Sequence, residues 1–268
     1  MAEPNDSINA IGSGPEYWYR FAGADAASQT NEGSGDATAF SNVGVAPTFQ
    51  HSTNSFGEAN RGVLAPPMGS IGGIESSSPL GGLSNKGTMM VVLRAISGSP
   101  SPGLFLMGLS DGNFDDDYLD FQYVANPNVF RWHTQDAFVG DTNFLYDDTS
   151  INLADGDHHS LCVVASDNPA NPPQMFADAI EDTTVAESVG TTPRNFWWDN
   201  FTGGERIAIF HRDGVGGVDH FDWVCYEFLM WDERLTPAQV QDAHNALFNQ
   251  IPITSKTIRR NNRRLYGF

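Results

Sequence analysis

The sequence predicts an all-β chain: an antiparallel β-sandwich with one short helix near the C-terminus. Apolar and aromatic runs of strand length recur along the 268 residues, separated by stretches rich in the 27 glycines and 15 prolines. Strand-like and helix-like segments do not alternate, which argues against a parallel sheet. A chain of this length is within the range of a single sandwich domain.

Strand-like runs follow one another along the chain, and turn-rich segments such as 22–37 and 69–87 lie between them. Residues 125–128, Ala-Asn-Pro-Asn, form a hairpin turn because Pro and Asn adopt or tolerate turn dihedral angles. The predicted strands are 16–21, 88–95, 103–108, 119–124, 129–133, 160–165, 174–179, 206–211 and 221–231.

One helix is predicted, at residues 236–250. Thr236 and Gln239 form a Thr-x-x-Gln capping box at its start. The apolar side chains that share one helical face are Val240, Ala243 and Leu247. We expect this helix to cover one end of the sandwich.

Charge divides the chain into an acid body and a basic tail. The formal charge is −19, and because residues 256–268 hold five basic residues and no acidic one, residues 1–255 carry −24. An acid body repels phosphate backbones and anionic lipid, so nucleic acid and membrane surfaces are poor partners. The sequence predicts a sandwich domain over 1–250 and an arm over 251–268.

Cysteine use and the N-terminus bear on the compartment of the protein. Cys162 and Cys225 each lie in an apolar run and are interpreted as buried thiols, with a disulfide bridge as the alternative. Residues 1–6 show neither the basic region nor the apolar stretch of a signal peptide, and no run approaches the ~20 apolar residues of a membrane span.

Several segments resemble the laminin G-like jelly-roll family of the concanavalin A-like lectin and glucanase superfamily. Residues 17–21 are similar to the first strand of the family, and 155–164 and 175–179 to an inner strand and its partner. The closing strand of the family is similar to residues 221–231. The helix that follows it in the family is similar to residues 234–240, Arg-Leu-Thr-Pro-Ala-Gln-Val. His158 stands where the family has Trp, and Ala179 and Gln239 stand where it has Gly and Glu.

The resemblance, the acid body and the basic arm together are similar to surface proteins of tailed-bacteriophage virions, such as tail fibres, spikes and capsid decoration proteins. They imply a non-enzymatic structural protein that assembles in the host cytoplasm, forms a homo-oligomer at the virion surface and recognises cell-surface glycans. Two alternatives stay open: a bacterial extracellular carbohydrate-binding module or adhesin, and a glycoside hydrolase of the same superfamily.

A hydrolase of this kind requires two carboxylates that flank the scissile bond, and no Glu-x-Asp-x-x-Glu motif is present. Asp222 and Glu227 lie five residues apart, so the alternation of a regular strand would send them to opposite faces. Tyr118 lies between Asp116 and Asp120, where the motif requires an acid. The sequence therefore favours a protein that is not an enzyme.

Five carboxylates within ten residues form a candidate calcium site, since oxygen ligands in a loop suit Ca²⁺. The alternative is a solvated acidic loop. No other cofactor is expected. The candidate ligands are Asp111, Asp115, Asp116, Asp117 and Asp120.

Three further patterns are interpreted. His158 and His159 are adjacent, so a strand would direct them to opposite faces and they would not share a zinc ion. The candidate glycan-contacting residues are Trp132, His133, Trp197, Trp198 and Asn200. The arm is expected to dock on an acidic, partly apolar surface of another virion protein through Lys256, Arg259, Arg260, Arg263, Arg264, Tyr266 and Phe268.

Overall fold

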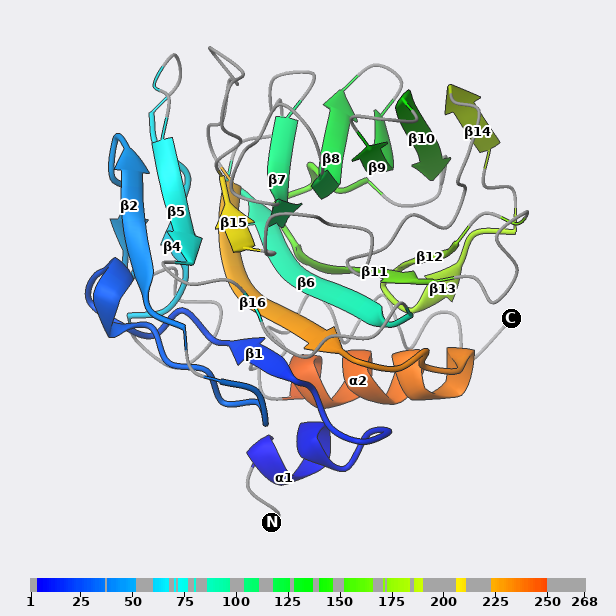
Figure 1. The fold of residues 1–268 in the computed structure, drawn as a ribbon, viewed down its shortest axis with the longest axis horizontal. Coiled ribbons are helices and arrows are strands. Elements are labelled where there is room, and N and C mark those ends of the chain that lie inside the picture. Colours follow the sequence, from blue (N-terminus) through cyan, green and yellow to red (C-terminus); the bar gives the residue numbers. More distant parts are fainter. Residues whose placement is uncertain are drawn as a thin grey trace, which may run out of the picture.

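The computed structural model is an antiparallel β-sandwich with a layer of helices on one sheet (Figure 1). The described residues are 4–36, 38–51, 60–67, 70, 72–76, 80, 86–96, 104–110, 118–125, 128–136, 140–146, 152–165, 171, 173–183, 186–189, 206–210 and 223–249. The predicted fold class is confirmed.

The central sheet, which we call sheet A, has the order β13-β12-β11-β6-β16-β4-β3, with β1 added beside β16. Its strands are β1 Tyr17–Tyr19, β3 Thr48–Phe49, β4 Val63–Leu64, β6 Thr88–Ala95, β11 His158–Val164, β12 Gln174–Ala177, β13 Ile180–Glu181 and β16 Trp223–Trp231.

The second sheet, sheet B, has the order β14-β10-β9-β8-β7-β15-β5-β2. Its strands are β2 Phe40–Gly44, β5 Gly72–Ser76, β7 Leu104–Ser110, β8 Tyr118–Ala125, β9 Asn128–Asp136, β10 Gly140–Tyr146, β14 Ala186–Val189 and β15 Arg206–Ile209. The helical segments are α1 Pro4–Asn9, the 3-10 turn η1 Ala26–Ser28 and α2 Pro237–Asn249.

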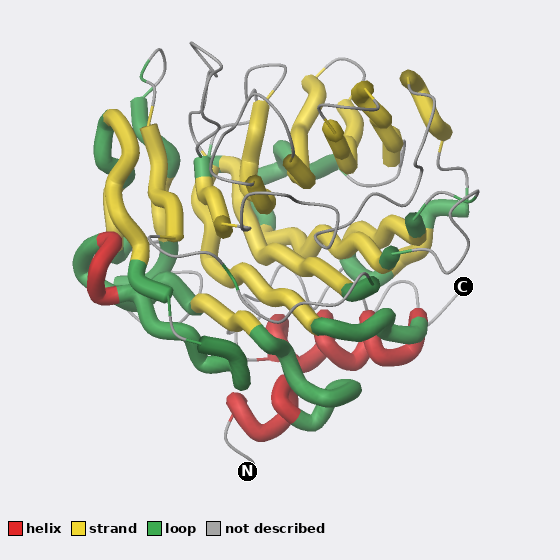
Figure 2. Tube along the Cα trace, in the orientation of Figure 1, coloured by secondary structure: helices red, strands yellow, loops and turns green. Residues whose placement is uncertain are grey.

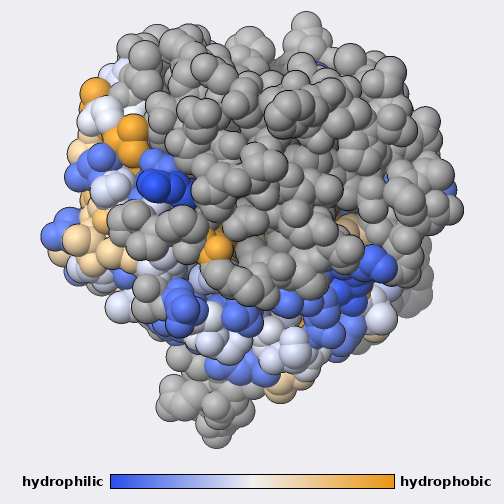
Figure 3. Space-filling view, in the orientation of Figure 1, coloured by the Kyte–Doolittle hydropathy of each residue, from blue (hydrophilic) through white to orange (hydrophobic). Residues whose placement is uncertain are grey.

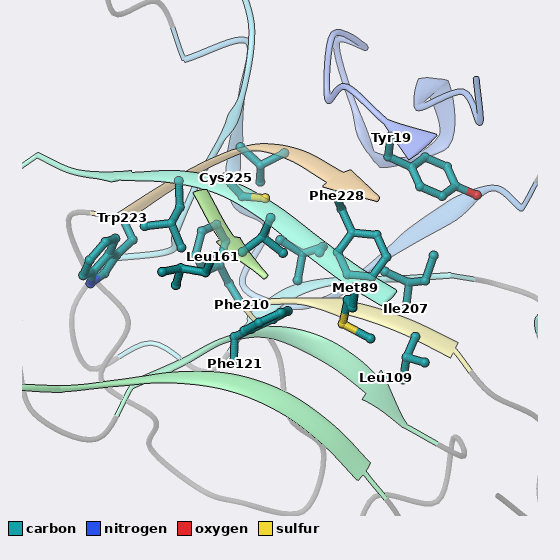
Figure 4. Close-up of a cluster of buried hydrophobic side chains, with 14 of the residues drawn as sticks. Tyr19, Met89, Leu109, Phe121, Leu161, Ile207, Phe210, Trp223, Cys225 and Phe228 are labelled. Carbon is teal, nitrogen blue, oxygen red and sulfur yellow. The ribbon is translucent and has the colours of Figure 1, made fainter. Parts of the chain in front are cut away.

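Two apolar layers hold these elements together. The inter-sheet core includes Phe121 of β8, Leu161 of β11 and Phe228 of β16, which point into the space between the sheets (Figure 4). A second cluster lies on the far side of sheet A and includes Ile8 of α1 and Leu247 of α2. The chain is therefore layered as sheet B, sheet A and helices (Figure 2).

Strands β6 and β16 are buried on both faces because they lie between these two layers. Met89 and Val91 of β6 face the inter-sheet core, while Met90 and Val92 face the helix side. A strand enclosed in this way is apolar at nearly every position rather than at alternate ones. This explains why residues 88–95 form a continuous apolar run, and the strand has the predicted bounds.

The predicted helix and its cap are confirmed, but its predicted location is wrong. Thr236 N–H donates to Gln239 Oε1 over 2.8 Å, and Gln239 N–H donates to Thr236 Oγ1 over 3.3 Å. The face formed by Val240, Ala243 and Leu247 is buried against sheet A. The helix thus covers a face of the sheet and not an end of the sandwich, because the helix-side residues of β6, β11 and β16 are also apolar.

The hairpin between β8 and β9 is confirmed, with Ala125 opposite Asn128. Both cysteines are free and buried, as expected; Cys162 lies in the helix-side cluster and Cys225 in the inter-sheet core. In the described segments no helix is long and apolar enough to span a membrane.

Candidate functional site

The outer face of sheet B, which points away from sheet A, carries a group of buried polar side chains. Leu119, Phe121 and Tyr123 of β8 face the inter-sheet core, so alternation directs Asp120 and Gln122 outward. Trp132 of β9 likewise faces inward, which directs its neighbour His133 to the outer face. The three outward residues belong to two adjacent strands.

Asp120, Gln122 and His133 form one hydrogen-bonded cluster, which we call the outer-face cluster. Asp120 and His133 are direct partners across the β8–β9 ladder. Gln122 Nε2 lies 3.2 Å from Asp120 Oδ2 and 2.8 Å from His133 Nδ1, and His133 Nδ1 lies 3.7 Å from Asp120 Oδ1. Asp120 is fully buried and the other two are less than 10% exposed.

A second polar pair lies on the same face, nearer to the β2 edge. Glu75 of β5 is paired with Ala208 of β15, and Arg206 of β15 places Nη1 3.6 Å from Glu75 Oε1. The Arg206 side chain is 34% exposed, so it is partly accessible on this face. Carboxylate, amide, imidazole and guanidinium groups are the polar groups that orient a hydroxyl-rich ligand.

Glu75 and Asp120, the acids whose side chains are described on this face, are too far apart to form a hydrolase pair. The register runs from Glu75 through Ala208 and Gly108 to Asp120, which places the acids three strand spacings apart, about 14 Å at the backbone. Paired carboxylates in glycosidases lie roughly 5 to 9.5 Å apart. Asp120 moreover accepts a hydrogen bond from Gln122 of its own strand, and its ladder partner His133 lies on β9, on the side away from Glu75.

The two predicted glycan residues that the structure describes lie on opposite faces of sheet B. His133 joins the outer-face cluster, but Trp132 is 1% exposed and its ring packs edge-on against Phe121 in the inter-sheet core at 5.0 Å. Trp132 is therefore a core residue, and its assignment as a sugar-stacking residue is corrected. Trp197, Trp198 and Asn200 lie outside the described residues.

Of the predicted calcium ligands, only Asp120 falls in the described part of the chain, and it lies within strand β8 and not in a loop. Asp111, Asp115, Asp116 and Asp117 lie outside it, as does the whole of the predicted docking arm, 251–268. Across the described segments, no group of three or more His, Cys, Asp or Glu side chains is arranged to hold a metal ion.

His158 and His159 point to opposite faces of β11, as the alternation predicts. His158 packs against the ring of Tyr226 on the helix side, with 4.8 Å between centroids. Burial, followed by the positive charges of Arg94 and His159, lowers the pKa of His158 to about 3. This imidazole is neutral at ordinary pH.

His159 has the opposite electrostatic environment. Its Nδ1 lies 2.8 Å from Asp178 Oδ2 and its Nε2 3.1 Å from Asp155 Oδ1. Burial alone would lower the pKa of His159, but the two carboxylate hydrogen bonds outweigh it and raise that pKa to about 10. The resulting ion cluster ties β11 to the β12–β13 turn, because Asp178 Oδ1 also accepts from Ser160 N–H.

Glu227 forms a further buried polar cluster that sequence reasoning missed. The carboxylate accepts from Trp18 Nε1 at 2.8 Å and lies 3.6 Å from Arg20 Nε and 4.0 Å from Arg61 Nη1. Burial raises the pKa of Glu227 to about 7, against the lowering effects of Arg20, the Trp18 bond and Arg61.

A β-bulge places Glu227 on a face that strict alternation along β16 would not give it. The pairing of β16 with β6 shifts between Cys225 and Glu227, so Glu227 lies opposite Val92 on the helix side, the same face as Val224. Strict alternation from Asp222 therefore does not hold along this strand. Asp222 itself lies outside the described residues, so the prediction that it and Glu227 face opposite ways stays a prediction.

The sequence does contain a signal for the outer-face cluster. A hairpin turn at 125–128 fixes the register of both flanking strands, because each step back along one strand is matched by a step forward along the other. Five steps before Ala125 lies Asp120, and five steps after Asn128 lies His133. The predicted hairpin was sufficient to place these two residues side by side.

Comparison with known proteins supports the fold. No protein-family model and no curated protein matches the chain. Solved structures do: Trypanosoma rangeli sialidase in complex with sialic acid has a TM-score of 0.56 at 11% identity, and the match covers 93% of this chain and 38% of the sialidase. The binding domain of Paraclostridial Mosquitocidal Protein 1 has a TM-score of 0.57 at 11% identity, with coverage of 92% and 54%.

The binding domain of Botulinum Neurotoxin DC in complex with SialylT is a third match, with a TM-score of 0.56, 11% identity and coverage of 91% and 52%. The chain thus spans about half or less of the length of these proteins. At such identities the likeness shows the shared β-sandwich fold.

Proposed function

We propose that this chain is a non-enzymatic, laminin G-like sandwich of a phage virion surface that binds host-cell glycans at the outer face of sheet B. The observation that carries glycan binding is the convergence of Asp120, Gln122 and His133, with the Glu75–Arg206 pair on the same face. Several hydrogen-bonding groups fixed on adjacent strands suit a ligand whose surface consists of hydroxyl groups.

The fold neighbours are consistent with this proposal. Two of them are described as complexes with sialic acid or SialylT, and another concerns cell entry of botulinum neurotoxin type C through two ganglioside molecules. Sialylated glycans are therefore the first ligands to test. The wide spacing of Glu75 and Asp120 favours binding over hydrolysis.

A glycan array that includes sialylated oligosaccharides tests the proposal on the purified protein. We expect a defined set of glycans to bind, Gln122→Ala to weaken binding, and Gln174→Ala on β12 of sheet A to leave it unchanged. Circular dichroism of each variant checks that it is folded. Release of reducing sugar from a bound glycan would support the hydrolase alternative instead.

The virion assignment rests on the contrast between the acid body, −24 over residues 1–255, and the basic arm. We propose that the arm docks on an acidic surface of another virion protein while the sandwich is displayed outward. Arginine pairs are well suited to such docking because each guanidinium binds carboxylates in a bidentate manner.

Deletion of 251–268 should abolish incorporation into particles without changing the melting temperature of the sandwich. Mass spectrometry of purified particles, from cells that express either the full or the shortened chain, measures incorporation. If the shortened chain enters particles as efficiently as the full one, arm docking is wrong; if neither enters, the bacterial adhesin alternative is favoured.

A further inference from the structure

The free edge of β2, at one end of sheet B, combines unpaired backbone groups with an uncharged sequence. β2 pairs with β5 along one side, from Phe40 opposite Ser76 to Gly44 opposite Gly72. Apart from this ladder, the described residues Ser41, Asn42, Val43 and Gly44 make no hydrogen bond. Every second residue of such a strand directs its N–H and C=O away from the sheet.

Apart from the ladder with β5, the contacts of β2 with other described residues lie on its core side. Phe40 packs against Tyr19 and Phe21, with ring centroids 4.8 and 6.1 Å apart, and Ala26 of η1 lies in the same inter-sheet core. The remaining side chains of β2 are exposed or partly exposed, and the adjoining Val45 is 45% exposed. Orange and tan atoms occur on the side of the molecule where β2 lies, whereas blue and white atoms prevail over α2 (Figure 3).

The other described sheet ends are better protected than β2. β3 and β13 have two residues each, and β14 contains Glu187. Proteins usually protect an edge by a short strand, a charge or a proline. β2 has five residues and none of these features within it.

The charge distribution favours this edge as a contact between two copies, because their acid bodies repel each other elsewhere. Residues 37–50 contain no Asp, Glu, Lys or Arg, whereas the body as a whole carries −24. Two acid bodies approach each other at the lowest electrostatic cost where such an uncharged stretch faces its own copy.

We infer that β2 is the contact of a homodimer, in which the β2 strands of two copies pair antiparallel and join two B sheets into one. An antiparallel strand is its own complement across a two-fold axis, so a second copy satisfies the free backbone groups with no other partner. Pairing centred on Val43 places the two Val43 residues beside each other and Val45 beside Ser41 of the second copy. This inference concerns self-association and does not depend on glycan binding.

Cross-linking tests the pairing directly. Val43→Cys should give a covalent dimer with a short bis-maleimide, because directly opposed residues lie about 5 Å apart between Cβ atoms. Cys162 and Cys225 are buried and should not react in the folded protein. Ile180→Cys, on the β13 edge of sheet A and 45% exposed like Val45, is the matched control and should remain monomeric on a denaturing gel.

Sedimentation equilibrium of the full chain tests the energetics. We expect the natural protein to dimerise at micromolar concentration, and Val45→Lys to raise the dissociation constant about tenfold or more, because it puts a charge on the edge of each copy. Ile180→Lys should leave the dissociation constant unchanged. A monomeric natural protein, or a dimer that survives Val45→Lys and is not cross-linked through Val43→Cys, would overturn the inference. Glycan binding by a monomer would leave the proposed function intact.

Discussion

At the scale of single residues, the β12–β13 turn has non-glycine residues at two positions where glycine is favoured, and this affects its stability. Asp178 and Ala179 have φ angles of 49° and 60°, and they connect Ala177 to its ladder partner Ile180. Positive φ at both central positions is the geometry of a tight hairpin turn, in which glycine is favoured. Asp178 gains hydrogen bonds to Ser160 and His159, whereas the methyl group of Ala179 is only partly buried, against the helix-side cluster.

Ala179→Gly should therefore stabilise the protein by about 0.5–1 kcal/mol, because it removes the left-handed strain of a Cβ. Urea unfolding measures the change. Ala177→Gly is the control, since this residue is extended and buried in β12, where glycine should destabilise by about 1 kcal/mol. Equal effects at the two positions would show that the turn is not strained.

The adjacent histidines should give opposite pH dependences of stability. The pKa of His159 is raised to about 10, so its stabilising ion cluster is complete below pH 6.5 and is lost between pH 6.5 and about 10. The pKa of His158 is lowered to about 3 in the folded protein. As the pH falls from 6.5 to about 3, His158 therefore becomes protonated in the unfolded chain but not in the folded chain, and the folded protein loses stability.

His159→Gln should cost about 2 kcal/mol at pH 6 and progressively less as the pH rises toward 10. His158→Gln should instead make the protein lose less stability than the natural protein does as the pH falls below 6.5. Chemical denaturation of both variants across this range checks the two signs. A pH-independent cost at His159 would mean that its ring is neutral in the folded protein.

The same residues show how far a sequence locates a site. Adjacent histidines on a strand must face opposite ways, and this was predictable from alternation alone. The convergence of Asp120 with His133 also followed from the hairpin register. Glu227 was out of reach because a bulge shifts the alternation of β16, and its partners Arg20 and Arg61 come from distant segments of the chain.

At the scale of elements, α2 combines a local cap with a buried face. The Thr236–Gln239 capping box satisfies backbone donors at the helix start, and His244 Nδ1 lies 2.8 Å from Ser160 Oγ of β11. Thr236→Ala should cost about 1 kcal/mol in urea unfolding, while Thr236→Ser, which retains the hydroxyl, should cost little. If Ser and Ala are equally destabilising, the cap does not contribute through its oxygen.

Strand prediction succeeded where the sequence pattern reflects burial and failed where pairing overrides propensity. β6 and β16 are apolar at nearly every position because both of their faces are covered, so they were readily recognised. β5, Gly72–Ser76, was assigned to a loop because glycine disfavours strands. Gly73 is needed there, since a Cβ would lie 2.3 Å from the carbonyl oxygen of Ile209 on the neighbouring strand.

At the scale of the whole molecule, the two outer sides of the layered structure differ in what they carry. The helices cover the far side of sheet A and complete a second apolar cluster there. The outer face of sheet B lies on the opposite side of the molecule and carries the outer-face cluster and the Glu75–Arg206 pair. This separation makes the outer face of sheet B the candidate recognition surface.

Isothermal titration calorimetry tests that assignment most directly. It measures the affinity of the tightest-binding glycan from the array for the natural protein and for the variants Arg206→Gln and Lys86→Gln. Each substitution removes one positive charge from a partly exposed side chain, but only Arg206 lies on the outer face of sheet B. We predict a loss of affinity of about tenfold for Arg206→Gln, roughly 1.4 kcal/mol, and unchanged affinity for Lys86→Gln. Equal affinity in both variants and the natural protein would contradict glycan recognition at this face.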